Sequence, residues 1–294
     1  MKDTGKILLY LLATIALGAA IAPPLFWAGR LAGAQFGIKV LAESGFPRYF
    51  NRAVLIAAVA LLWPLAKSLR VASFSSFGLQ PDPRRWRHLV FGFATAFLVL
   101  FAFVAALLHE GIYRLRSDAA PALLAPILLS AAGASVIEEL IFRGALLGLL
   151  RRTLAPHAAL FFVSALYSIV HFVQPRAAGS RPDAIHFLSG FALLPDVFWR
   201  FTQPVQVLSG FTTLFLLGWI LGYAAIRTRA LWLSIGIHAG CILGKYGSSR
   251  LTKRTADWTP WIGGDLQTGI LPLFVLGAMG LIVWAGLKFE ARKT

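Results

Sequence analysis

Sulphur and negative charge are scarce in this sequence. Cys241 is the only cysteine among 294 residues, which excludes an intrachain disulfide and a metal knuckle built from two cysteines. The chain has 12 Asp and Glu against 28 Lys and Arg, and charged residues make up only 14% of it. In soluble proteins roughly a quarter of the residues are charged. The HExxH pattern of helical zinc sites is also missing.

Long apolar runs take the place of the missing charge. Hydrophobic residues make up 58% of the chain, and runs of this length predict helices that cross a membrane. The predicted fold class is an all-α polytopic membrane protein with about eight transmembrane helices around a polar intramembrane cavity. The predicted helices cover residues 7–28, 53–69, 88–108, 119–150, 157–174, 207–226, 230–245 and 270–288.

Three long connections separate these runs. Residues 29–52 mix aromatic and basic side chains, which predicts a helix lying on the membrane surface. Residues 175–206 combine Pro, Gly and aromatics, which favours an interfacial or re-entrant lid. Residues 246–269 carry Trp258 and Trp261, two candidate anchors at the membrane interface.

One membrane domain is predicted to cover residues 1–294. Within it, 1–118 would hold the N-terminal spans and the interfacial segment, 119–245 the catalytic core helices, and 246–294 a loop and the last span.

The net charge of +16 lies mostly between the apolar runs. Basic residues that flank spans favour anionic lipid headgroups as partners rather than nucleic acid. Basic residues at 84–87, 151–152 and 227–229 favour both termini on the cytoplasmic side. A prokaryotic plasma membrane is the expected location.

Three ionisable side chains lie together inside the fourth apolar run: Glu138, Glu139 and Arg143. Charges at membrane depth cost several kcal/mol each, about 2.5–3.5 on insertion scales, so they usually serve a function. Glu139 and Arg143 are four residues apart and can pair on one helical face. Glu138 points about 100° away from Glu139, so we expect it to face a cavity as the working carboxylate.

Two histidines on other runs are candidates for the same site. Glu138 and His171 each lie about sixteen residues from the turn near 154–156, which at about 1.5 Å per residue places them at similar depth on antiparallel helices. The depth of His238 matches less closely. Gly236 and Gly240 flank it, and small residues allow helices to approach.

Such a group of residues supports two chemistries. In one, Glu138 activates water as a general base, His171 orients the water, and His238 donates to the oxyanion of the tetrahedral intermediate. In the other, histidine and glutamate ligands hold a metal ion such as zinc, with an open position for water. The metal-free chemistry without a cofactor is favoured.

These residues resemble a known family. Glu138-Glu139-x-x-x-Arg143, an aromatic four residues before His171, and His238 on a later span look like the three motifs of the CAAX protease and bacteriocin-processing (CPBP, or Abi) family. The resemblance covers about 120–245. It implies an intramembrane endopeptidase of the glutamate type, in which Glu138 and His171 activate water and His238 helps to form the oxyanion hole. Glu139, Arg143 and Tyr167 would support the site.

Two positions depart from the family pattern. Tyr167 stands where the second motif usually has Phe, and Ile242 stands where the third motif usually has Asn. The second change removes a hydrogen-bond donor, a loss that elsewhere costs about 2.7–4 kcal/mol of transition-state stabilisation. Cys241, one position earlier, is a poor substitute donor.

The predicted function is hydrolysis of a peptide bond in a membrane-associated or lipid-modified substrate. Two alternatives stay open. One is a proton-coupled transporter that uses Glu138, Glu139 and His171 as a relay. The other is a non-enzymatic scaffold or immunity protein with a degenerate site, which Ile242 favours. These residues also have a purely structural interpretation, in which the charged cluster only locks helices together and His238 only forms a hydrogen bond between helices.

Overall fold

The computed structural model describes residues 3–70, 82–118, 124–176 and 185–292. These residues are mostly helical, which confirms the all-α polytopic fold class. They form two compact units. The N-terminal unit combines residues 1–72 with 169–207, and the C-terminal unit combines 73–168 with 208–294. The single domain stays a prediction.

All eight predicted runs contain a helix, and six helices in the described part of the chain are long and apolar enough to span a membrane. These six are Gly5–Phe36, Phe46–Ser68, Arg85–His109, Leu124–Leu150, Pro204–Thr228 and Leu271–Ala291. The two other runs contain α7 (Pro156–Val170), which is apolar but shorter, and α10 (Trp232–Leu251). Eight membrane crossings therefore stay a prediction.

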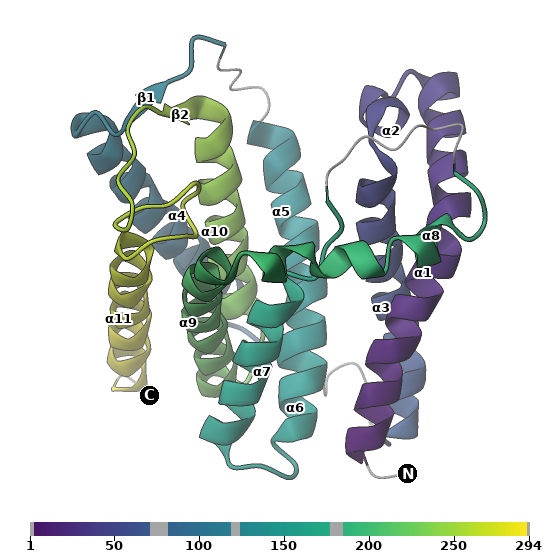
Figure 1. The fold of residues 1–294 in the computed structure, drawn as a ribbon. Coiled ribbons are helices and arrows are strands. Elements are labelled where there is room, and N and C mark those ends of the chain that lie inside the picture. The colour runs from purple at the N-terminus through teal and green to yellow at the C-terminus, as the bar shows by residue number, and fades with distance from the viewer. Residues whose placement is uncertain (1–2, 71–81, 119–123, 177–184, 293–294) are drawn as a thin grey trace. The chain divides into compact units, whose positions relative to one another are not determined.

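The N-terminal unit is built on two long helices that lie side by side, α1 (Asp3–Phe36) and α3 (Phe46–Ser68) (Figure 1). Their core is aromatic, with Phe26 packed edge-on against both Phe46 and Tyr49. Edge-to-face contacts of this kind stabilise beyond the apolar area they bury.

The predicted surface helix over 29–52 is wrong. Residues 29–36 continue α1, which ends just before Gly37, a residue with a positive φ of 66°. A short helix, α2 (Lys39–Glu43), follows, and α3 then begins at Phe46. The aromatic residues that suggested an interfacial helix include Phe46 and Phe50, which are buried in the core.

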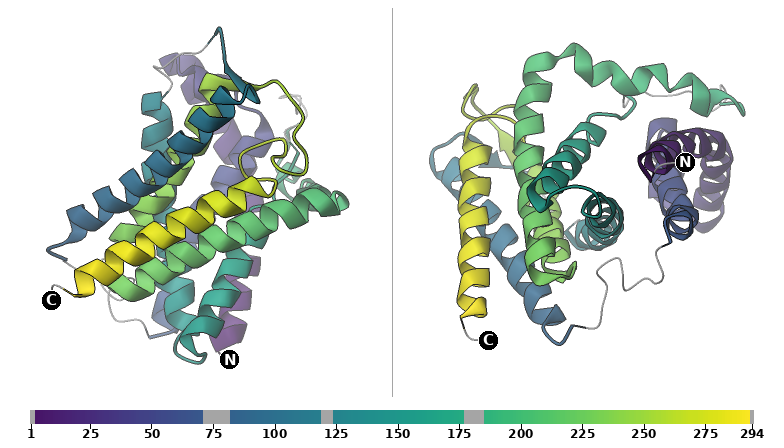
Figure 2. Two further views of the ribbon diagram at one scale, coloured as in Figure 1. Left: turned by 90° about the vertical axis from the view of Figure 1, so that its left-hand side faces the viewer. Right: turned by 90° about the horizontal axis from the view of Figure 1, so that it is seen from below.

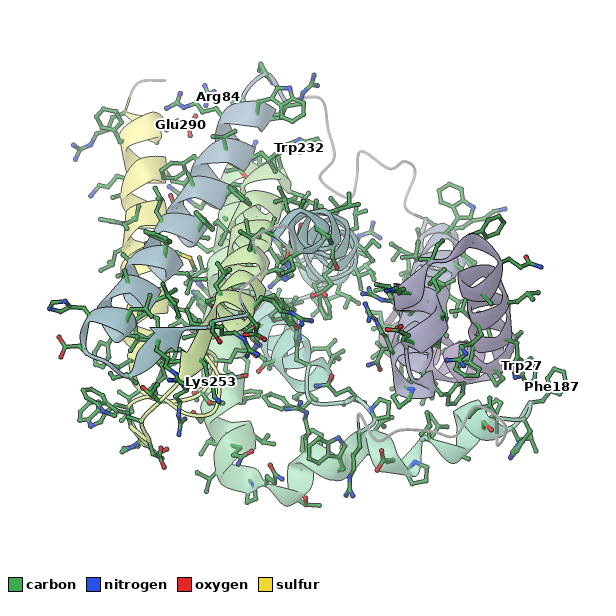
Figure 3. The ribbon with its side chains drawn as sticks, turned by 90° about the horizontal axis from the view of Figure 1, so that it is seen from above. Trp27, Arg84, Phe187, Trp232, Lys253 and Glu290 are labelled. Atoms are coloured by element: carbon green, nitrogen blue, oxygen red, sulfur yellow. The ribbon has the colours of Figure 1, made fainter. Side chains whose placement is uncertain are left out.

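The segment 185–207 of the same unit contains α8 (Ser189–Ala192) and a 3-10 helix (Pro195–Thr202). The rings of Trp27 and Phe187 meet edge-on with centroids 4.8 Å apart (Figure 3). The predicted lid role of residues 175–206 stays a prediction, and 177–184 lie outside the described residues.

The C-terminal unit is held together by α10, which packs along α4 (Arg85–His109). The carbonyl of Leu89 lies so close to α10 that a Cβ built at Gly236 would overlap it. A Cβ at Gly240 would lie 2.6 Å from the carbonyl oxygen of Phe93. The close approach predicted from these two glycines is therefore found, and the neighbour is α4.

Two further helices complete this unit, α9 (Pro204–Thr228) and α11 (Leu271–Ala291), which lie side by side (Figure 2). Their apolar faces enclose the main core together with α4 and α10. This core is formed by Ala96, Leu100, Leu217, Ile220, Leu221, Ala224, Leu233, Ile237, Cys241, Leu276, Met279, Val283 and Leu287.

A small sheet joins the far ends of α4 and α10. Strand β1 (Tyr113–Leu115) pairs antiparallel with β2 (Thr252–Arg254), and Tyr113 lies opposite Arg254. Sequence reasoning placed no strand here. Trp258 and Trp261, in the loop that follows β2, are exposed, as interface anchors would be.

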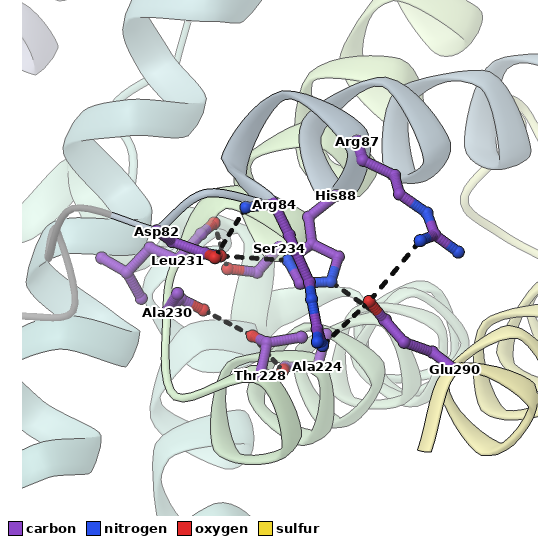
Figure 4. A network of polar contacts seen from close by, with 10 residues as sticks. All are labelled: Asp82, Arg84, Arg87, His88, Ala224, Thr228, Ala230, Leu231, Ser234 and Glu290. Carbon is purple, nitrogen blue, oxygen red and sulfur yellow. Dashed lines mark hydrogen bonds and ion pairs between the residues drawn. The ribbon is translucent and has the colours of Figure 1, made fainter. Parts of the chain in front are cut away.

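A polar network fastens the start of α4 to the end of α11 (Figure 4). The buried imidazole of His88 contacts Asp82 through Nδ1 at 3.3 Å and Glu290 through Nε2 at 3.1 Å. Arg84 also pairs with Glu290, at 3.2 Å. The turn into α10 is closed beside this network by the Thr228 hydroxyl, whose one proton can go to the carbonyl of Ala224 or of Ala230, each 2.9 Å away.

Candidate functional site

The two glutamates end a helix at a change of helical type. Helix α5 (Leu124–Glu139) continues into a π-helical segment, Leu140–Leu146, and then into α6 (Leu147–Leu150). The N–H of Leu147 bonds to the carbonyl of Phe142, five residues back. Such π-helical turns are rare and are frequent at functional sites. The predicted helix start at 119–123 falls outside the described residues.

Glu139 and Arg143 form the predicted pair. Arg143 Nη1 donates to Glu139 Oε1 at 2.7 Å, and both side chains are fully buried. Arg143 Nη2 also donates to the carbonyl of Gly218 on α9, at 3.2 Å. The guanidinium carbon lies 4.4 Å from the ring centre of Tyr167 on α7, a cation–π distance. Arg143 therefore links its own helical segment to α7 and α9.

His238 on α10 completes the network. Its Nδ1 lies 2.9 Å from Glu139 Oε1, and its Nε2 lies 3.3 Å from the hydroxyl of Tyr167. The same Nε2 is 3.7 Å from Glu138 Oε2. His238 is 3% exposed. One imidazole thus contacts both glutamates, a meeting that the depth argument predicted only loosely.

The two glutamates have different surroundings. Glu139 is fully buried, contacts the side chains of Arg143 and His238, and faces the arginine cation. Glu138 has 24% of its side chain exposed, and its Oε2 faces Nε2 of the same imidazole. Their division into a structural and an accessible carboxylate agrees with the helical geometry of the sequence.

Because it is buried, the pair of Glu139 and Arg143 is sensitive to the loss of either charge. Two opposite charges in a dry interior offset the cost of leaving water only while both are present. Removing one partner of such a pair destabilises by about 3–5 kcal/mol, because the other charge stays buried without compensation. Glu139 and Arg143 therefore hold α5, α9 and α10 at fixed positions around His238.

The structure places His171 just beyond a helix end. Helix α7 ends at Val170, and His171 opens the turn that follows. It belongs to the N-terminal unit, whereas Glu138 belongs to the C-terminal unit. The meeting of His171 with Glu138 stays a prediction, as does the polar cavity around them.

Two other residues of α10 lie close to His238 in the sequence. Ile242, one turn beyond His238, is partly buried, and its apolar side chain brings no hydrogen-bond donor. Cys241 is buried, with its sulfur 4.0 Å from that of Met279. Sequence reasoning missed the carbonyl of Gly218 as a partner of Arg143, because a backbone acceptor leaves no signal in the residue type.

No group of three or more His, Cys, Asp or Glu side chains that could hold a metal ion occurs among the described residues. The His238 Nδ1 is occupied by Glu139, so Nε2 is the nitrogen left for other chemistry.

The fold and the network together define an integral membrane protein of the helical class with a glutamate–histidine centre in its interior. Residues 119–243 match the family model described as Type II CAAX prenyl endopeptidase Rce1-like. This region is therefore an Rce1-like domain, and the predicted resemblance to the CPBP family is confirmed. Members of this family are peptide hydrolases, which makes the chain a membrane protease by class. Neither the curated proteins nor the solved structures gave a match.

Proposed function

We propose that this protein is an intramembrane endopeptidase that hydrolyses a peptide bond of a membrane-associated or lipid-modified substrate with water activated by Glu138. The observation that carries the proposal is the position of His238, whose two ring nitrogens face the two glutamates, at 2.9 Å and 3.7 Å. A proton can pass along these two contacts of the imidazole without leaving the site.

Each side chain has a distinct role in the proposal. Glu138 is the general base, since its carboxylate is partly exposed and can therefore reach a water molecule. His171, the histidine of the second motif, orients the water with it. Glu139 and Arg143 are positioning residues, because they fix the imidazole of His238 from the buried side.

The charges of the network are compatible with base chemistry at Glu138. The cation of Arg143 compensates the anion of Glu139. When Glu138 takes a proton from water it becomes neutral, and its negative charge passes to the attacking oxygen and then to the oxyanion. The net charge of the site is therefore unchanged, and the new anion needs a hydrogen-bond donor.

The location of the site supports the proposed substrate class. A bond cleaved here would be presented by a chain already held at the membrane, through its own span or through a covalent lipid. The matching family model describes prenyl endopeptidases, and a prenylated peptide is therefore one candidate substrate. A prokaryotic plasma membrane is the location we propose.

The decisive experiment compares membrane peptides from cells that express the wild-type protein, Glu138→Gln, or Glu110→Gln. The last variant makes the same chemical change at an exposed position beyond α4. Peptides absent only from the Glu138→Gln cells support the proposal and identify the substrate. Equal peptide profiles in all three would refute it.

The metal-free form of the proposal has its own test. Cleavage of the identified substrate by purified protein should persist after dialysis against a strong zinc chelator. Loss of cleavage, restored by added zinc, would instead assign Glu138 and His238 to a metal site.

A further inference from the structure

Tyr167 is held at the centre of the network by its ring. The side chain is 1% exposed. The ring of Phe142 meets it edge-on, with centroids 5.2 Å apart, and the Arg143 guanidinium lies against its face. The ring fixes the phenol hydroxyl 3.3 Å from His238 Nε2. A tyrosine packed for its ring alone does not need a hydroxyl in this position.

The contact of His238 with Glu139 determines what each imidazole nitrogen can do. The Glu139 carboxylate only accepts hydrogen bonds, so the Nδ1 that faces it at 2.9 Å carries a proton. In a neutral imidazole the other nitrogen is then an acceptor. In that tautomer the Tyr167 hydroxyl, 3.3 Å away, is the donor to Nε2.

A neutral His238 of this tautomer has no proton to give at Nε2. It cannot donate to an oxyanion, which is the role that the sequence motif implied for it. The next turn of α10 offers no replacement, because Ile242 has an apolar side chain. His238 Nε2 is contacted by the carboxylate of Glu138 and by the hydroxyl of Tyr167, and of these two groups the hydroxyl is the neutral hydrogen-bond donor.

We propose that the Tyr167 hydroxyl is the hydrogen-bond donor that stabilises the oxyanion of the tetrahedral intermediate. This inference rests on the proposed function. At rest the hydroxyl donates to His238 Nε2, and when the substrate carbonyl gains negative charge the same O–H turns to the new oxyanion. Tyr167 keeps its proton throughout.

The proton balance of the step closes within the site. Water forms the new C–O bond, the carbonyl electron pair becomes the oxyanion, and the water proton passes to Glu138. The protonated carboxyl is then a donor, and His238 Nε2, released by Tyr167, is an acceptor 3.7 Å away in the resting structure. When the C–N bond breaks, Glu138 returns this proton to the leaving amine.

The first test is Tyr167→Phe, which removes only the hydroxyl and keeps the ring beside Arg143. Because one oxyanion donor is lost, kcat should fall by about 10²–10³-fold with little change in KM. The matched control is Tyr10→Phe in α1, where a buried tyrosine also loses a hydroxyl, one that donates to the carbonyl of Ala58 at 2.9 Å. That variant should keep wild-type kcat.

The second test is a rescue. Ile242→Asn places an amide one turn beyond His238, and in the Tyr167→Phe background it should recover about 10-fold or more of the lost kcat, since a single oxyanion donor is worth at least that much. A merely structural hydroxyl would not be replaced by an amide on another helix, so failure to recover overturns the proposal.

The outcomes separate the inference from the proposed function. If Tyr167→Phe keeps kcat close to that of wild type while Glu138→Gln is inactive, the role of Tyr167 is refuted and the protease proposal stands. If Glu138→Gln itself stays active, the proposed function fails, and the inference fails with it.

Discussion

The pair formed by Glu139 and Arg143 makes a quantitative prediction about stability. Arg143→Met keeps much of the length and apolar volume of the side chain but removes the cation. The Glu139 carboxylate, which Arg143 Nη1 contacts at 2.7 Å, would remain buried with no compensating charge from this position. We expect the free energy of unfolding to fall by about 3–5 kcal/mol.

The double variant Glu139→Gln with Arg143→Met provides the sharper result. It removes both charges, and the amide oxygen introduced at position 139 can still accept from Nδ1 of His238. A well-matched neutral replacement of a buried ion pair is often close to neutral in energy. The double variant should therefore be more stable than Arg143→Met alone, although it carries one more substitution.

The assay is unfolding in mixed micelles, followed by tryptophan fluorescence and extrapolated to zero denaturant. Arg116→Met is the control, because Arg116 pairs with Asp118 at 3.1 Å on the exposed surface. Exposed pairs contribute little, so this variant should unfold as wild type does. A loss below about 1 kcal/mol for Arg143→Met, or a double variant as weak as the single one, would contradict the reasoning.

Two further predictions concern the helices that position α10. His88→Gln can satisfy Asp82 or Glu290 but not both, so the free energy of unfolding should fall by about 1–3 kcal/mol. A protease should then cut the end of α11 sooner than in the wild type. Equal cutting rates would show that the network adds no stability. Gly236→Ala places a methyl group against the carbonyl of Leu89 and should destabilise the protein by about 1–3 kcal/mol. Gly277→Ala is the control and should not destabilise it, because its new Cβ has no neighbour among the described residues. Identical melting temperatures for the two variants would contradict the close approach.

The sequence predicted what depends on local geometry. Apolar runs located the helices, some of them to within a few residues, as for 157–174 against Pro156–Val170, and others less closely, as for 7–28 against Asp3–Phe36. The spacing of four residues predicted the pair of Glu139 with Arg143, and the angle between neighbouring residues separated Glu138 from it. These relations depend on one helix at a time.

Relations between helices were predicted less well. Counting residues from turns matched Glu138 closely with His171, which stays a prediction, and only loosely with His238, which contacts both glutamates within one unit. The depth of α10 is set by its packing on α4 through Gly236 and Gly240. Counting residues from the turns takes no account of such packing.

The misplaced surface helix and the missed sheet have related causes. Residues 29–36 continue α1 because nothing breaks the helix before Gly37. Strands β1 and β2 are three residues each and come from distant parts of the sequence. A strand this short has too few residues to show an alternating pattern.

The π-helical segment sets the direction in which the two glutamates leave their helix. Leu140–Leu146 contains wider hydrogen-bonded rings than the helices on either side. Each residue in it therefore turns the chain by less than the about 100° of an ordinary helix. A change that rewound the segment as an ordinary helix at the same length would turn Glu138 and Glu139 relative to α6, although every side chain of the motif would still be encoded.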